Sequence, residues 1–310
     1  MILAVLWMWV GLGLAGGSGD FDQSALQGKV RSLEMYWVPQ AEVIVERPQP
    51  DLQLSYRERY DTRGRLIEEN DYASDGSLEW KTTYRYDQFD RVTELLEHDG
   101  DGSLEWKTTY RYGSHGKIVE QEVHGADGER ISATTYEYSS DHRGHLREGE
   151  AFTLDGSLAR RVRFDLQGNL IEETGYWLSR MPIWKRLFRY DDRGNEVERA
   201  QYDYNRDPSG VLIMRRISRY DRYGSLVEVM NYGSADLLET RTSFRYDEQG
   251  NRIAEVTYGR DGEMTSSISY RYHYDEHANW VRQEGKEDFY QAGVRQYGLS
   301  WAWVRDISYY

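Results

Sequence analysis

The chain has 310 residues, with 39 Lys and Arg against 53 Asp and Glu and no cysteine, which gives a formal net charge of −14. This acidic balance argues against nucleic acids and anionic membranes as partners, since phosphate groups are bound by basic surfaces. The lack of cysteine excludes a disulfide framework, a thiolate metal site and a cysteine nucleophile, and the aromatic content of 14% is typical of a folded chain rather than a disordered acidic one.

The N-terminus has the pattern of a secretory signal. Residues 2–15 are uncharged and largely apolar, and Ala15-Gly16-Gly17 supplies small residues at which a signal peptidase cuts. The apolar run is too short for a bilayer of about 30 Å, so we predict a signal peptide over residues 1–17. No Lys or Arg precedes the run, which leaves a short membrane anchor or a misplaced start codon as alternatives. We expect no membrane span after the signal is removed.

Residues 18–50 are predicted to be an N-terminal capping segment. They contain a strand-like stretch from Gly28 to Val38, and Pro48 and Pro50 separate this stretch from a long repeat array. Such an array needs a cap because its end unit would otherwise expose an unpaired strand edge.

Residues 51–282 are one repeated pattern with a period of about 26 residues. Each unit begins with an aromatic anchor, usually followed by Asp, with Gly four positions after the anchor in most units. A second turn, often Asp-Gly, lies about half a period later. A fixed period of this length indicates one supersecondary unit stacked many times. The anchors are Tyr60, Tyr86, Tyr112, Tyr138, Phe164, Tyr190, Tyr220, Tyr246 and Tyr274.

Two turns in each period leave two segments of about nine residues, which is a strand length. The segments alternate, as where Leu78, Trp80 and Thr82 point one way and Glu79 and Lys81 point the other. We therefore predict an all-β fold, a long antiparallel β-hairpin meander of about nine repeats. Since open sheets beyond about ten strands tend to curl, we expect a curled or spiral sheet. Residues 283–310 are predicted to be C-terminal capping strands.

The repeat also predicts a strand register. If the Asp-x-x-Gly segment is the loop, the residue two before each anchor lies opposite the residue seven after it. The Arg before the anchor is then a diagonal neighbour of the Glu eight positions after it, within reach of long side chains. This predicts six surface ion pairs, Arg59–Glu68, Arg85–Glu94, Arg111–Glu120, Arg163–Glu172, Arg189–Glu198 and Arg219–Glu228.

The recurring Arg-Tyr-Asp-x-x-Gly-Asn/Arg-Leu/Ile-x-Glu, as at Arg59–Glu68, resembles the YD repeat of RHS-type bacterial proteins, over roughly residues 52–282. The last unit, which contains Asn279-Trp280-Val281-Arg282, resembles the ending of small exported YD-repeat proteins. The resemblance implies a β-hairpin shell, bacterial export and a binding or structural role. It implies no catalytic residue, and nothing here resembles the self-cleaving core or the toxin domain of the large RHS toxins.

Several residues are candidates for a site, each with a structural alternative. Trp80 and Trp106 share a column with Leu158, Trp184, Met214 and Ile268, which favours a core position over sugar stacking. The segment His98–Ser103 is similar to a calcium loop but lacks the bidentate Glu of an EF-hand. His273 and His277 straddle a turn, which is a weak metal pattern. We therefore predict no catalytic, cofactor-binding or metal-binding residue, no cofactor and no enzyme activity.

Three hypotheses of function follow. The first is an exported, non-catalytic repeat protein that acts as a binding or structural module for a protein or a neutral glycan, in the periplasm or at the cell surface. The second is a toxin-neutralising or immunity partner of an RHS-type system, in which the acidic surface meets a basic toxin. The third is a carbohydrate-active hydrolase with Asp and Glu in a groove. The identity of residues 75–86 and 101–112 indicates duplication and favours a scaffold over a single catalytic centre.

Overall fold

The computed structural model describes residues 26–39, 52–113, 116–141, 145–153, 155–177, 181–205 and 207–310. The predicted signal peptide and the proline pair at 48 and 50 lie outside these residues. The described residues contain 20 strands and a short 3₁₀ helix, η1 (Ser234–Asp236). The strands are β1 (Val30–Pro39), β2 (Gln53–Tyr60), β3 (Leu66–Tyr72), β4 (Leu78–Tyr86), β5 (Val92–Asp99), β6 (Leu104–Tyr112), β7 (Ile118–Gly125), β8 (Arg130–Ser140), β9 (Leu146–Phe152), β10 (Leu158–Phe164), β11 (Leu170–Tyr176), β12 (Pro182–Tyr190), β13 (Glu196–Asp203), β14 (Val211–Tyr220), β15 (Leu226–Tyr232), β16 (Leu238–Tyr246), β17 (Arg252–Tyr258), β18 (Met264–Tyr274), β19 (Trp280–Gln291) and β20 (Val294–Tyr309).

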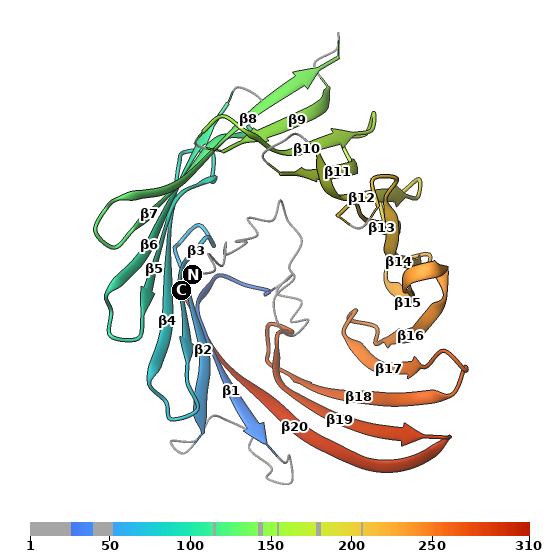
Figure 1. The fold of residues 1–310 in the computed structure, drawn as a ribbon. Helices are drawn as coiled ribbons and strands as arrows, with labels where there is room; N and C mark the ends of the chain where they lie inside the picture. Colours follow the sequence, from blue (N-terminus) through green and yellow to red (C-terminus); the bar gives the residue numbers. More distant parts are fainter. Residues whose placement is uncertain are drawn as a thin grey trace.

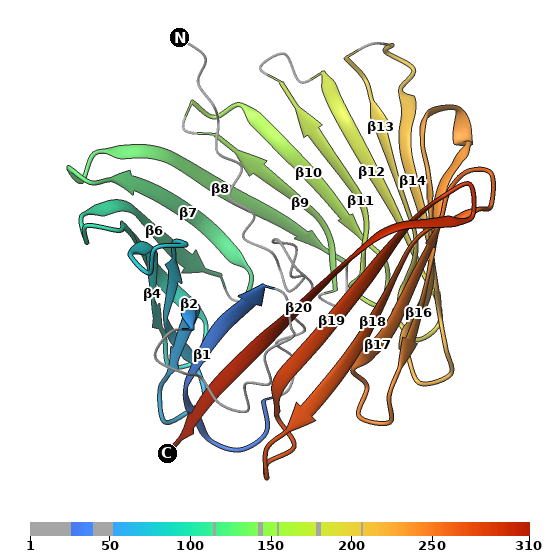
Figure 2. The same ribbon diagram turned by 90° about the horizontal axis from the view of Figure 1, so that it is seen from below.

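The strands form one closed barrel (Figures 1 and 2). Each strand pairs antiparallel with its neighbours in sequence, and β1 also pairs with β20, from Val30 opposite Tyr309 to Pro39 opposite Trp301. The predicted all-β antiparallel meander is confirmed, whereas the predicted curled or spiral sheet is wrong. The strand-like segments near the two ends of the chain pair with each other, because an open sheet would leave both as free edges.

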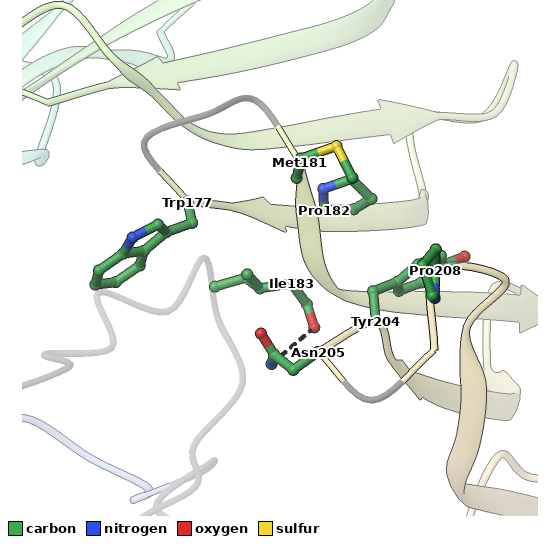
Figure 3. A pocket seen from close by; sticks show the side chains of 7 residues that line it. All are labelled: Trp177, Met181, Pro182, Ile183, Tyr204, Asn205 and Pro208. Atoms are coloured by element: carbon green, nitrogen blue, oxygen red, sulfur yellow. Dashed lines mark hydrogen bonds between the residues drawn. The ribbon is translucent and has the colours of Figure 1, made fainter.

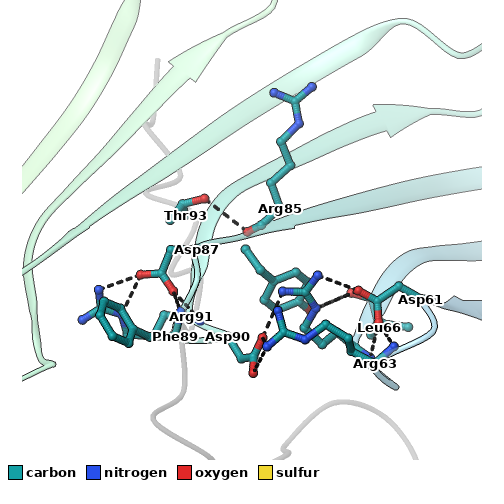
Figure 4. Close-up of polar contacts among 11 residues, drawn as sticks. Asp61, Arg63, Leu66, Arg85, Asp87, Phe89, Asp90, Arg91 and Thr93 are labelled. Carbon is teal, nitrogen blue, oxygen red and sulfur yellow. Dashed lines mark hydrogen bonds and ion pairs between the residues drawn. The ribbon is translucent and has the colours of Figure 1, made fainter.

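The repeated Asp organises the turn after each anchor. Asp61 Oδ1 accepts the backbone N–H of Arg63 at 2.8 Å and that of Arg65 at 3.0 Å (Figure 4). The N–H of Gly64 donates to the Asp61 carbonyl at 2.9 Å, with a φ of +79° that favours glycine. The same two carboxylate hydrogen bonds recur in other units, at Asp87, Asp165, Asp191, Asp221, Asp247 and Asp275.

One turn carries a residue that its backbone disfavours. Ala278 stands where most units have glycine, and its φ is +63°. We expect Ala278→Gly to raise the free energy of unfolding by about 0.5–1 kcal/mol, because glycine relieves the left-handed strain. Urea unfolding measures the change. Gly250→Ala is the matched control, since its φ is +86° and an added Cβ meets nothing within 4 Å. Equal shifts of the same sign in both variants would show that φ is not the cause.

Several anchor tyrosines bind their unit to the one before it. The hydroxyl of Tyr86 donates to the Leu66 carbonyl at 2.6 Å, and that of Tyr112 donates to the Val92 carbonyl at 2.7 Å. Both acceptors are the first residue of a strand in the preceding unit, 20 residues earlier. The same contact recurs at Tyr190 and Tyr246. The aromatic residue and the Asp of the motif therefore have separate tasks, one between units and one within the turn.

A β-bulge after each turn shifts the predicted register. Tyr60 lies opposite Leu66, whereas Arg59 lies opposite Glu68, so Ile67 is an extra residue in its strand. The same irregularity follows the turns of other units. The predicted opposition of positions −2 and +7 is therefore wrong, because the bulged residue moves the partner of position −2 to +9. The Arg and Glu of a unit face one another directly instead of diagonally.

All six predicted Arg–Glu pairs are present, with N–O distances of 2.8–3.6 Å. The Arg side chains are half or more exposed, so each pair contributes under about 1 kcal/mol. In several units the Glu also contacts a basic residue of the next strand, as where Lys81 Nζ lies 3.0 Å from Glu68. We call this side of the wall the charged face.

The opposite side of the wall, the aromatic face, carries the residues that alternate with the Arg–Glu pairs. On β6, Thr108 and Tyr110 of this face are buried, whereas Arg111 of the charged face is exposed. Side chains are more crowded on the concave side of a barrel wall, so the aromatic face is the one that lines the interior.

The last repeat closes the barrel. The buried side chain of Asn279 accepts the backbone N–H of Gln27 at 2.6 Å and donates to the Gln27 carbonyl at 2.8 Å. It also donates to the Tyr309 hydroxyl at 2.7 Å. The turn before β19 thus binds the segment that leads into β1 and the end of β20 at once. The terminal motif that resembles the ending of small YD-repeat proteins lies at this seam.

Candidate binding site

The column of Trp80 and Trp106 lies on the aromatic face but is not a closed core. In this column Leu158 is buried, while both tryptophans are only partly buried. A barrel wall of one sheet has no second layer to cover them, which is why the predicted core position is only partly correct. Trp80 lies directly opposite Asp71 on β3 and Asp99 on β5. The two indoles therefore lie beside acidic residues.

The other candidates from the sequence do not form metal sites. In the His98–Ser103 segment, Asp99 Oδ1 accepts the backbone N–H of Asp101, and Asp101 Oδ1 accepts that of Ser103, so these carboxylates stabilise the turn. His277 stacks on Tyr309 with ring centroids 4.1 Å apart. Among the described residues no group of three or more His, Asp or Glu side chains could hold a metal ion.

Four carboxylates on the aromatic face lack a basic partner. Glu69, Asp71, Glu97 and Asp99 form no ion pair with Lys or Arg within the described part of the chain, in contrast to the paired glutamates of the charged face. The register places Glu69 and Glu97 on either side of Thr82, and Asp71 and Asp99 on either side of Trp80. Together with both indoles they form what we call the acidic aromatic patch: Glu69, Asp71, Trp80, Glu97, Asp99 and Trp106.

Glu97 is the most unusual member of the patch. Its side chain is 4% exposed, and its Oε2 atom has no hydrogen-bond partner in the described structure. Burial raises the pKa of this carboxyl to about 7. The buried hydroxyl of Thr108, diagonal to Glu97 across β5 and β6, also lacks a partner among the described residues. Unpartnered buried polar atoms are costly, so they indicate a role other than stability.

Tyrosines border the patch on its β2 side. Tyr56 Oη lies 2.9 Å from Glu58 Oε1 and 2.8 Å from Glu69 Oε1. A phenol has one hydrogen to donate, so these two contacts need a proton on one of the carboxyls. Burial raises the pKa of Glu58, and the negative charge of Glu69 raises it further. The hydrogen bonds from Tyr60 and Tyr56 act in the opposite direction and lower it. The nearby guanidinium of Arg305 is itself buried and stacks on Trp280, 3.3 Å from the ring centroid.

A second feature, which the sequence reasoning missed, lies at one rim of the barrel. A cavity of about 610 Å³ opens between the β11–β12 and β13–β14 loops (Figure 3). Its lining is largely apolar and includes the exposed Trp177 and Met181. Asn205 Nδ2 donates to the Ile183 carbonyl at 3.3 Å and connects the β13–β14 loop to the start of β12. The signal in the sequence is the spacing of 30 residues between Tyr190 and Tyr220, where the repeat is interrupted.

No family model matches the chain, and no curated protein matches it. Among solved structures it is similar to a porin-like protein from Bacteroides uniformis, with 12% identity, 91% of this chain and 99% of that chain covered, and a TM-score of 0.34. A porin-like protein from Bacteroides vulgatus gives 13% identity, 91% and 98% coverage and a TM-score of 0.30. The Photorhabdus luminescens Tc holotoxin pore gives 10% identity and a TM-score of 0.26, with 80% of this chain and 18% of that chain covered. These values are too low to support an argument about function.

Proposed function

We propose that this chain is an exported, non-catalytic YD-repeat protein of the bacterial envelope that binds a partner on the acidic aromatic patch. The observation that supports the proposal most is the contrast between the two faces of the same strands. On β5 the charged-face Glu94 is paired with Arg85 at 2.9 Å and with Lys107 at 2.7 Å, whereas the aromatic-face Glu97 has no basic partner. Unpaired carboxylates lower stability, so their presence beside two indoles favours recognition. The signal-like residues 1–17 support export.

No helix in the described ranges is long and apolar enough to cross a membrane.

A comparison of two charge-matched variants tests the proposal. The full chain, immobilised, is exposed to envelope extract of a bacterium that encodes it, and retained molecules are identified by mass spectrometry. A patch variant carries Glu69→Gln, Asp71→Asn, Glu97→Gln and Asp99→Asn. A control variant carries Glu68→Gln, Glu94→Gln, Glu120→Gln and Glu172→Gln on the charged face. We expect a molecule that the wild type and the control retain and the patch variant loses. Retention that is identical in both variants would contradict the proposal.

A carbohydrate hydrolase is the second candidate, and Glu97 is the observation that favours it. Its pKa of about 7 and its position directly opposite Trp106 are compatible with a general acid beside a sugar-stacking ring. Under our proposal a screen of neutral oligosaccharides shows no turnover by the wild type. Turnover that Glu97→Gln abolishes would replace the binding function with the hydrolase.

A further inference from the structure

The repeat provides an internal template for what binds at the acidic aromatic patch. Glu173 of β11 occupies the same repeat position as Glu69, nine residues after its anchor, and is buried. Two arginines neutralise it: Arg160 Nη1 lies 2.9 Å from Oε1, and Arg186 Nη1 lies 3.5 Å from Oε2. Arg186 also stacks on Trp184, 4.9 Å from the ring centroid. A carboxylate, a guanidinium and an indole thus form one unit on this stretch of the aromatic face.

At the patch the same positions lack the cation. Register places Glu173 opposite Arg186 and, correspondingly, Glu69 opposite Thr82. Trp80 is the counterpart of Trp184 in its repeat, two residues before Thr82. The carboxylate and the indole are therefore kept at the patch, and the guanidinium is replaced by a short hydroxyl side chain.

The second copy of the duplicated segment keeps the indole and the threonine, but Leu95 stands at the position that Glu173 and Glu69 hold in their repeats. Trp106 is followed two residues later by Thr108, again in place of an arginine. Trp106 lies directly opposite Glu97, whose unpartnered Oε2 is buried on the same face. An ammonium or guanidinium group inserted between them would supply both the missing hydrogen bond and the missing charge. This buried atom is independent of the acidic composition of the patch and itself indicates a donor from outside.

We propose that the acidic aromatic patch binds guanidinium and ammonium groups of a basic polypeptide segment, which take the place that Arg186 occupies beside Trp184. The inference rests on the proposed binding function and names its ligand class. A planar guanidinium suits the patch because it donates to carboxylates while its face stacks on an indole. Two such sites lie on alternate strands, β4 and β6, about 10 Å apart, which a single extended basic segment can span.

The test uses hexa-arginine, hexa-lysine and spermine as probes, with binding to the full chain measured by calorimetry at low and at physiological ionic strength. Thr82→Arg recreates the internal cation and should weaken hexa-arginine binding about tenfold, the size of one lost cation–π contact with its ion pair. Trp80→Phe should weaken it less and leave the fold intact. Trp184→Phe, at an indole that already carries Arg186, should leave the affinity unchanged.

The net charge of −14 attracts any polycation, so the control must match charge. Glu94→Gln on the charged face lowers the negative charge by one, as Thr82→Arg does, and should leave the affinity near that of the wild type. Equal losses in Thr82→Arg and Glu94→Gln would overturn the site. Binding of spermine as tight as that of hexa-arginine would assign the patch to free polyamines instead of a polypeptide. If hexa-arginine does not bind but the envelope partner still depends on the patch, the binding function stands and the ligand class is wrong.

Discussion

Replacing Asn279 with alanine should lower the free energy of unfolding by about 3 kcal/mol, because three hydrogen bonds across the seam are lost at once. Its side-chain amide accepts the backbone N–H of Gln27 and donates to the Gln27 carbonyl and to the Tyr309 hydroxyl. Asn279 is 4% exposed. Chemical denaturation of the full chain measures the loss. Near-UV circular dichroism should change as well, since Trp280 and Tyr309 lie at the seam.

Asn195→Ala is the matched control for this prediction. Asn195 holds the same position in an earlier repeat, but its side chain donates only to Asp191 within its own turn, at 2.9 Å. We expect a loss of about 1 kcal/mol or less there. Similar losses at Asn279 and Asn195 would mean that the amide acts only within its turn and that the seam is held by the β1–β20 ladder alone.

Raising the pH from about 5 to about 8 should lower the free energy of unfolding by up to about 3 kcal/mol through Glu97. The ordinary pKa of a glutamate carboxyl is 4.5, and burial in the fold raises that of Glu97 to about 7. The folded state therefore holds the proton more tightly, and stability falls as pH rises from 4.5 through 7. Glu97→Gln keeps the site neutral, so the variant should be more stable than the wild type near pH 8 and should lack this slope.

The control for the pH effect is Thr108→Val, which changes a neighbouring buried group that does not titrate. Its stability should shift by the same amount at both pH values. At more acidic pH the wild type loses stability for a different reason: hydrogen bonds from the Asn195 side chain and from the backbone lower the pKa of Asp191, and this support is lost as the pH falls through that lowered pKa. A wild-type slope that persists unchanged in Glu97→Gln would show that Glu97 is not its source.

The site was only partly predictable from the sequence. Trp80 and Trp106 stood out because the residues around them are duplicated, but the sequence does not show which acids share their face. The bulge after the anchor turn moves the partner of position −2 from +7 to +9 and places Asp99 opposite Trp80. A second bulge, at the Asp-Gly turn, places Glu97 opposite Trp106 and Asp71 opposite Trp80. Aligning the repeats shows that Thr82 stands where Arg186 stands in a later repeat. The sequence does not show that Arg186 forms an ion pair with Glu173, and this ion pair is what identifies the missing cation at Thr82.

The sequence alone determined the strands, the turns and the Arg–Glu pairs, because all of these depend on contacts between residues a few positions to one repeat apart. A carboxylate that accepts two N–H groups, a glycine with positive φ and an Arg facing a Glu are local facts that recur with the period. Closure of the barrel depends on Val30 meeting Tyr309 and on Asn279 meeting Gln27, contacts that no periodicity encodes. Only the tertiary structure decided that the ends join and that a few described carboxylates on the inner face are left without a basic partner, since both depend on how the whole wall curves.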